Sequence, residues 1–139
     1  MNTAIEHLSK HISSDTSGIL WLTDSPLDYK TSGVYEFNYL LDGILLKRIT
    51  QNKNLEVENK KSNFFLGQNF GRPLFISHVV INEKRDIDIM YQHIKTALPL
   101  IAENSKIHIY NRSKNTANIN ILKEVSQKFI GHTFQNLNI

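Results

Sequence analysis

The sequence predicts an α/β (α+β) fold in which helices flank a mixed, centrally parallel sheet. The 139 residues are 40% apolar and 21% charged, a composition typical of globular domains. Strand-like and helix-like segments alternate over residues 74–135, as they do in βαβ units with parallel strands. No repeat or proline-rich linker divides the chain, so residues 1–139 are expected to form a single domain.

Two helices and one strand are predicted in the first third of the chain. Apolar residues recur at helical spacing over residues 2–11 and again over 34–41, where Gly43 ends the segment. Between the two helices, residues 19–22 form a short apolar run that is typical of a buried strand. A loop containing Pro26 is expected to follow this strand.

Strands dominate the middle of the chain. Residues 44–50 are predicted to form a strand, and residues 55–57 are its candidate hairpin partner. Residues 64–66 form a further short strand, and a turn over residues 67–71 follows. Residues 74–81 carry the strongest strand signal, because Phe, Ile and Val dominate them.

The last third of the chain predicts a regular alternation of elements. A helix, a strand, a second helix and a second strand are expected at residues 87–98, 106–110, 121–129 and 133–135. Pro99 ends the first helix, and Asn115 or Thr116 is expected to cap the second.

Composition excludes several functional classes. The chain has no cysteine, which rules out disulfides, cysteine-ligated zinc, iron–sulfur clusters and thiol nucleophiles. No apolar run approaches the roughly 20 residues that a membrane helix needs. Glu6, His7, Lys10 and His11 are atypical of a signal peptide, so a cytoplasmic location is expected.

Charge is uneven along the chain. Residues 47–85 carry eight basic and three acidic residues, a net charge of +5. Such a stretch favours an acidic partner, which would be a nucleic acid, a phosphate-bearing cofactor or an acidic protein. Phe64 and Phe65 lie close to Lys60 and Lys61, a pattern that can stack nucleic-acid bases unless the phenylalanines belong to the core.

Known catalytic motifs do not occur in the chain. It has no phosphate-binding Gly-Lys-Ser/Thr loop, no Gly-x-Gly-x-x-Gly, no His-Glu-x-x-His and no Gly-x-Ser-x-Gly. Among the six histidines only His7 and His11 have a metal-like spacing, so no metal site is expected. His78 shares its strand face with Leu74 and Val80, which favours either a hydrogen-bonded core imidazole or a buried, neutral general base.

Two sequence segments resemble the bacterial toxin-activating lysine acyltransferases, the family that activates RTX toxins. The first is Gly-Ile-Leu-Trp-Leu at 18–22 with Ser-Pro-Leu-Asp at 25–28, where the family has Ser-Pro-Leu-His. The second is Gly-Arg-Pro-Leu-Phe-Ile-Ser at 71–77, which is similar to the family's strand with the catalytic aspartate. The resemblance implies a GNAT-like fold, the fold of CoA-dependent N-acetyltransferases.

The resemblance also implies the position of a catalytic site, in which the histidine and the aspartate of the family would exchange places. The family's histidine falls on Asp28 and its aspartate on Ser77, next to His78. The hypothesis is that His78, oriented by Asp28, deprotonates a lysine or other amine for attack on a thioester. Ser77 completes the candidate catalytic set.

Binding roles follow from the same resemblance. Arg72, Lys84, Arg85 and Trp21 are the candidate residues for binding the donor or the substrate. An acyl-carrier protein or acyl-CoA is the implied donor, a protein is the implied acceptor, and a homodimer is the implied assembly. Segments 74–81 and 106–110 are expected to be adjacent parallel strands that diverge at one end. The gap between them is expected to hold the thioester.

Two other functions stay open at this point. The chain lacks both family catalytic identities and has no glycines over residues 82–85 to wrap a pyrophosphate. A catalytically degenerate, protein-binding module is therefore the first alternative. Nucleic-acid binding through the basic region at 47–85 is the second.

Overall fold

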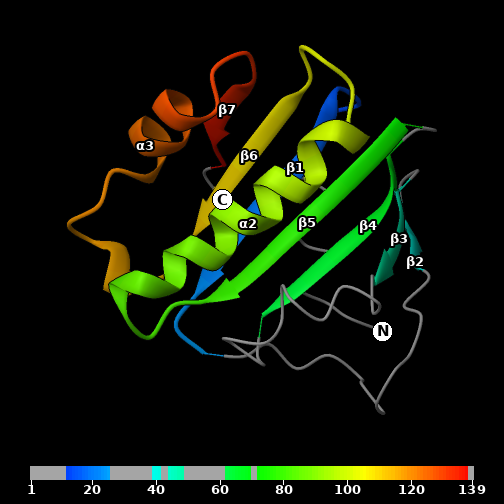
Figure 1. The fold of residues 1–139 in the computed structure, drawn as a ribbon. Helices are drawn as coiled ribbons and strands as arrows, with labels where there is room; N and C mark the ends of the chain where they lie inside the picture. The colour runs from blue at the N-terminus through cyan, green and yellow to red at the C-terminus, as the bar shows by residue number, and fades with distance from the viewer. Residues whose placement is uncertain (1–11, 26–38, 42–43, 49–61, 70–71, 138–139) are drawn as a thin grey trace.

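One seven-stranded sheet runs through the computed structural model, which describes residues 12–25, 39–41, 44–48, 62–69 and 72–137. The strands are β1 (Thr16–Thr23), β2 (Tyr39–Leu41), β3 (Ile44–Arg48), β4 (Asn63–Asn69), β5 (Arg72–Val80), β6 (Lys106–Asn111) and β7 (Thr133–Asn136). The described α-helices are α2 (Ile87–Ala97) and α3 (Ile121–Lys128) (Figure 1). The mixed α/β class expected from the sequence is confirmed at this level.

The strand order is β2-β3-β4-β5-β1-β6-β7. Strands β5, β1, β6 and β7 pair in parallel with one another, whereas β2, β3, β4 and β5 pair antiparallel. The sheet is therefore parallel on one side and antiparallel on the other. The expected βαβ arrangement is present in β5-α2-β6 and in β6-α3-β7.

Strand β1 lies at the centre of the parallel half. All eight of its residues are buried, because a strand with neighbours on both sides and covered faces meets no solvent. Helix α2 connects β5 to β6, and strand β1 lies between these two strands in the sheet. The prediction that strands 74–81 and 106–110 are adjacent is therefore wrong.

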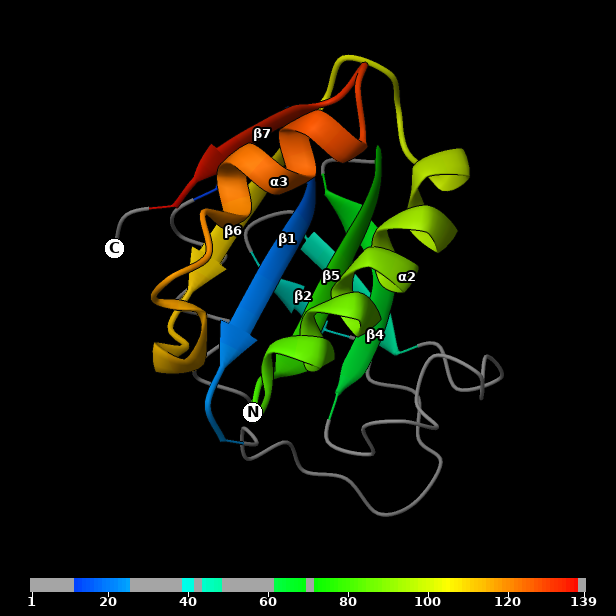
Figure 2. The ribbon, with the colours of Figure 1, turned by 60° about the vertical axis from the view of Figure 1, so that its left-hand side comes forward.

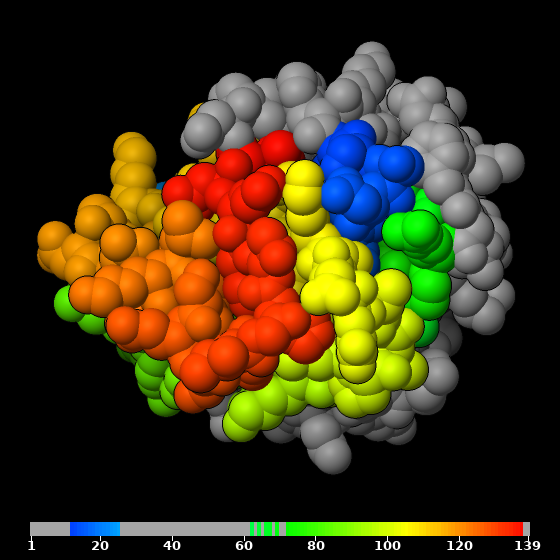
Figure 3. Space-filling model, turned by 90° about the horizontal axis from the view of Figure 1, so that it is seen from above, coloured from blue at the N-terminus to red at the C-terminus, as the bar shows by residue number. Residues whose placement is uncertain are grey.

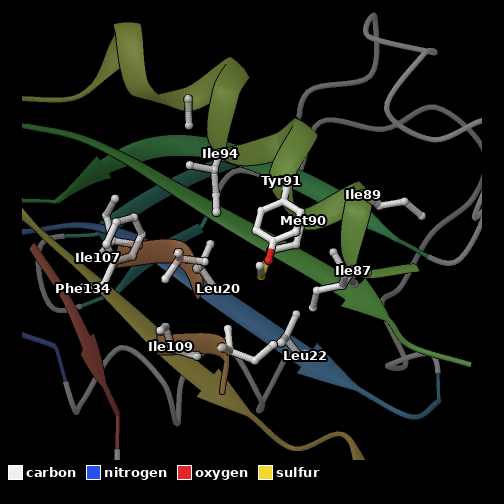
Figure 4. Close-up of a cluster of buried hydrophobic side chains, with 14 of the residues drawn as sticks. Leu20, Leu22, Ile87, Ile89, Met90, Tyr91, Ile94, Ile107, Ile109 and Phe134 are labelled. Carbon is white, nitrogen blue, oxygen red and sulfur yellow. The ribbon is translucent and has the colours of Figure 1, made fainter. Parts of the chain in front are cut away.

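Both helices pack on the same face of the sheet (Figure 2). Leu20 and Leu22 of β1 meet Met90 and Ile94 of α2 there, all four of them fully buried (Figure 4). Helix α3 lies beside β7, as the view from the end where the parallel strands begin shows (Figure 3). Phe129 at the end of α3 packs on Phe134 of β7, and this apolar contact holds α3 over the edge of the parallel half.

Most of the predicted elements in the second half are confirmed. Helix α2 continues into a 3-10 turn, Leu98–Leu100, which contains the predicted terminator Pro99. The predicted cap of the last helix was wrong, because Asn115 and Thr116 belong to a separate 3-10 turn. Asn120 caps α3 instead.

Two predictions differ in the first half. Residues 39–41 form strand β2 rather than the end of a helix, and β4 extends through the predicted turn at Gly67. The predicted helix 2–11 and the hairpin partner 55–57 lie outside the described residues.

Candidate functional site

His78 lies on the face of the sheet opposite the helices and has no exposed surface. Its Nε2 is 3.0 Å from the hydroxyl oxygen of Thr23, on the neighbouring strand β1. The hydroxyl hydrogen of Thr23 is donated to the carbonyl oxygen of Ser25, 2.8 Å away. Both contacts of the Thr23 hydroxyl are satisfied together when Nε2 of His78 donates to it.

The buried setting controls the charge of His78. Burial, with a smaller contribution from the charge of His93, lowers the pKa of His78 to about 4. His78 is thus neutral at physiological pH, which is the form that the sequence analysis expected. A base with this pKa is a weak acceptor for the proton of a lysine ammonium, whose ordinary pKa is about 10.4.

Ser77 points to the other face of the sheet, towards α2. Its Oγ lies 2.7 Å from Nδ1 of His93, and neither residue has any exposed surface. The His93 ring also packs on Phe64, with 5.2 Å between the ring centroids. A serine–histidine pair can form a nucleophile, but here both side chains are buried within the protein. Ser77 and His78 therefore face opposite layers and do not share one site.

Trp21 packs against His78 rather than forming an open binding surface. The two ring centroids are 5.2 Å apart, and Trp21 is only 3% exposed. Tyr110 on β6 lies on its other side, 6.4 Å away between centroids. The structure brings Trp21, His78 and Tyr110 together as an aromatic group in which Trp21 and His78 are buried and Tyr110 is half-buried.

The other predicted site residues are dispersed. Arg72 is exposed at the start of β5, six residues before His78, a span of about 20 Å along a strand. Lys84 and Arg85 are exposed just beyond the other end of β5, where Arg85 forms an ion pair with Glu83. Asp28 lies outside the described residues, so its pairing with His78 stays a prediction.

The described parallel strands stay joined to their carboxyl ends. The Ile81 amide donates to the Thr23 carbonyl at 2.8 Å, on the β5 side of β1. The Arg112 amide donates to the Leu22 carbonyl at 2.7 Å, on the β6 side. The diverging pair of strands that was expected to hold a thioester is therefore not found between β5, β1 and β6.

Asp24 anchors the chain at this end of the sheet. Its carboxylate accepts from the Ser113 hydroxyl at 2.8 Å and from the Lys114 amide at 3.0 Å. The Asn115 side chain bridges Asp24 to the Ile81 carbonyl. The Lys114 amide, followed by the Ser113 hydroxyl, lowers the pKa of Asp24. Asp24 therefore caps the start of the 3-10 turn Lys114–Thr116.

A pocket of about 370 Å³ opens at the carboxyl ends of β6 and β7, beneath the start of α3. It is lined by Ile109, Asn111, Ile119, Asn120, Ile121, Leu122, Asn136 and Leu137. Three asparagines and five apolar residues therefore line a space within the usual size range for ligand sites, and the exposed surface of this lining is mainly polar. Among the residues that the structure describes, none with an ionisable side chain lines this pocket.

Local hydrogen bonds hold two of these carboxamides in place. Asn120 accepts from the Lys123 amide at 3.1 Å as the cap of α3. Asn111 donates to the Thr116 hydroxyl at 2.8 Å. Asn136 is contributed by β7. The sequence analysis missed this pocket, although ligand sites commonly lie at the carboxyl ends of parallel strands, and all three asparagines end a strand or begin a helix.

The structure also bears on three other features considered from the sequence: base-stacking aromatics, a metal site and a membrane-spanning helix. Phe64 is a core residue, which agrees with the core alternative for one of the aromatics proposed to stack bases. Within the described ranges, no group of three or more histidine and carboxylate side chains is arranged to hold a metal ion. None of the helices in the described part of the chain has the length and apolarity to cross a membrane.

Comparison with known proteins identifies no relative: no protein-family model, no curated protein and no solved structure matches the chain.

Proposed function

We propose that this chain is a binding module for another protein, and that the pocket beneath α3 receives part of that partner. The observation that carries the proposal is the chemistry of the pocket, which combines three carboxamides with isoleucine and leucine side chains. Carboxamides both donate and accept hydrogen bonds, so they suit the amide groups of a polypeptide. A mainly polar lining without charged residues among those described suits an uncharged side chain.

The contrast with the histidines supports a non-catalytic role. His78 and the Ser77–His93 pair lie within the protein interior, and the described residues that line the pocket include no acid, base or nucleophile of comparable chemistry. General acid–base catalysis needs such a group within hydrogen-bond reach of substrate. Binding needs only shape and matched hydrogen bonds.

A peptide-display selection tests the proposal. The full chain is immobilised and used to select from a random peptide library, and the enriched peptide is synthesised for affinity measurement. We expect Asn136→Asp to weaken binding about tenfold, because it removes an amide donor from the pocket and adds a charge. Gln135→Glu makes the same chemical change on the opposite face of β7 and is the matched control.

The outcomes of the selection are distinct. Loss of binding in Asn136→Asp, with Gln135→Glu within about twofold of the parent, supports the pocket. Failure to enrich any peptide, or equal effects of the two variants, overturns the proposal. Thermal melts of both variants ensure that a lost affinity is not lost folding.

Acyl transfer, the function implied by the family resemblance, requires its own experiment. The full chain is incubated with an acyl-carrier protein or acyl-CoA donor and a candidate acceptor protein. The intact mass of the acceptor is then followed. An enzyme-dependent mass increase equal to one acyl group would favour transferase activity over the binding module that we propose.

A further inference from the structure

Strand β7 is an edge strand of the described sheet and lies beside the pocket. It pairs with β6 on one side and is the last strand in the order of the described sheet (Figure 2). An unpaired strand edge presents rows of main-chain donors and acceptors that another chain can use. The pocket reaches this edge, since Asn136 of β7 and the following Leu137 both line it.

Register determines which main-chain groups are available. The Leu137 amide donates to the Ile109 carbonyl at 2.8 Å, so residue 137 faces β6. Alternation along a strand makes Thr133 and Gln135 face β6 as well. The amide and carbonyl groups of Phe134 and Asn136 consequently point away from the sheet.

The edge is short, is anchored in the core, and lacks the other common protections of an edge strand. The Phe134 side chain is buried and packs on Phe129, with 6.4 Å between the ring centroids. Natural edge strands are often blocked by lysine, proline or a bulge. Residues 133–136 contain neither lysine nor proline, and their register with β6 is continuous.

We infer that the partner binds as an extended, uncharged segment that adds a strand at β7 and inserts one neutral side chain into the pocket. This inference rests on the proposed function and specifies its geometry. The lack of charge in the partner follows from β7 (Thr-Phe-Gln-Asn) and the pocket lining, neither of which offers an ionisable side chain. A buried charge without a partner would be costly there. Main-chain pairing provides affinity and the pocket provides selectivity, as in other cases of strand addition.

Amide hydrogen exchange by NMR tests the inference, with the peptide from the library selection as the probe. On saturation with that peptide, the amides of Phe134 and Asn136 are expected to exchange at least about tenfold more slowly. The amides of Thr133 and Gln135 already face β6 and serve as internal controls. N-methylation of the peptide at alternate residues is expected to abolish binding in one phase and spare it in the other, because alternate amides face the partner strand.

Each result separates this inference from the proposed function. A peptide that binds through the pocket without slowing exchange at Phe134 and Asn136 overturns strand addition and leaves the binding module standing. Enrichment of no peptide overturns both. Slower exchange at the same two amides when the chain alone is concentrated identifies a second copy as the occupant and overturns the peptide partner.

Discussion

The Phe75 ring on β5 fills the space next to Gly18 on the neighbouring parallel strand β1, where a side chain of residue 18 would otherwise lie. The two residues are register partners, and a Cβ on residue 18 would lie 2.2 Å from Cε1 of Phe75. The phenyl ring is fully buried and therefore has little room to move. A side chain at residue 18 and this ring cannot occupy the same space.

Gly18→Ala is therefore expected to destabilise the protein by about 1–3 kcal/mol through overpacking. Urea unfolding measures the change. The double variant Gly18→Ala, Phe75→Leu should recover part of the loss relative to Phe75→Leu alone, because the smaller side chain vacates the space. Equal destabilisation by Gly18→Ala in the two backgrounds would contradict this explanation.

The packing also explains a motif that the sequence analysis interpreted through a family resemblance. The Gly-Ile-Leu-Trp-Leu segment has a sufficient structural reason: Gly18 admits Phe75, Leu20 and Leu22 enter the core, and Trp21 packs on His78. A buried central strand alone requires such residues.

Local patterns predicted the elements from β5 onwards well, because strong strand and helix periodicities are encoded within about ten residues. The position of β1 between β5 and β6 is a long-range choice that no local pattern contains. Leu40 and Leu41 fit a helical spacing, which predicts a helix that includes residues 39–41, yet pairing with β3 makes these residues a strand. Tertiary pairing overrode a short apolar signal.

The candidate site was harder to predict for a related reason. The sequence identified His78 as buried but gave no means to distinguish a core imidazole from a base, because that depends on what its neighbours accept and donate. The pocket is formed by asparagines from three separate segments. Their meeting depends on the strand order, which the local sequence does not specify.

Stability should decrease as the pH falls from about 6.5 to about 4. The folded-state pKa of His78 is about 4, below its ordinary value of 6.5, so the unfolded chain takes up the proton first. Over this window the difference amounts to about 3 kcal/mol at most. Burial also lowers the pKa of His108, which acts in the same direction.

Urea unfolding at a series of pH values measures this loss, and an NMR titration of the folded protein gives the pKa of His78 directly. His78→Gln should flatten the dependence over the same window, because glutamine does not titrate. A folded-state titration near pH 6.5 would contradict the burial argument, whether or not the variant folds.

Asp24→Asn should lower the melting temperature at neutral pH. Hydrogen bonds from the Lys114 amide and the Ser113 hydroxyl hold the Asp24 pKa below its ordinary 3.8. The resulting stabilisation is complete above that pH and is lost as the pH falls through the folded-state pKa. The melting temperatures of the parent and the variant are therefore expected to converge in strong acid.

The matched control for this comparison is Glu103→Gln, which removes a charge from an exposed turn residue. It should leave the melting temperature nearly unchanged. A difference between Asp24→Asn and the parent that persists unchanged in strong acid would mean that the charge of Asp24 is not responsible.

Ser77→Ala distinguishes a core hydrogen bond from a catalytic one. The substitution takes from His93 Nδ1 the hydroxyl that lies 2.7 Å away, in a place where water does not replace it. A cost of about 1–3 kcal/mol in unfolding free energy is expected, whereas exposed Ser126→Ala on α3 should change it by less than about 0.5 kcal/mol. A double-mutant cycle with His93→Leu should show coupling, because the two residues share the bond.

Affinity for the selected peptide should stay within about twofold of the parent, since Ser77 does not line the pocket. If Ser77→Ala instead leaves stability intact and abolishes acyl transfer to an acceptor protein, the serine is a catalytic residue and the buried pair must open to substrate.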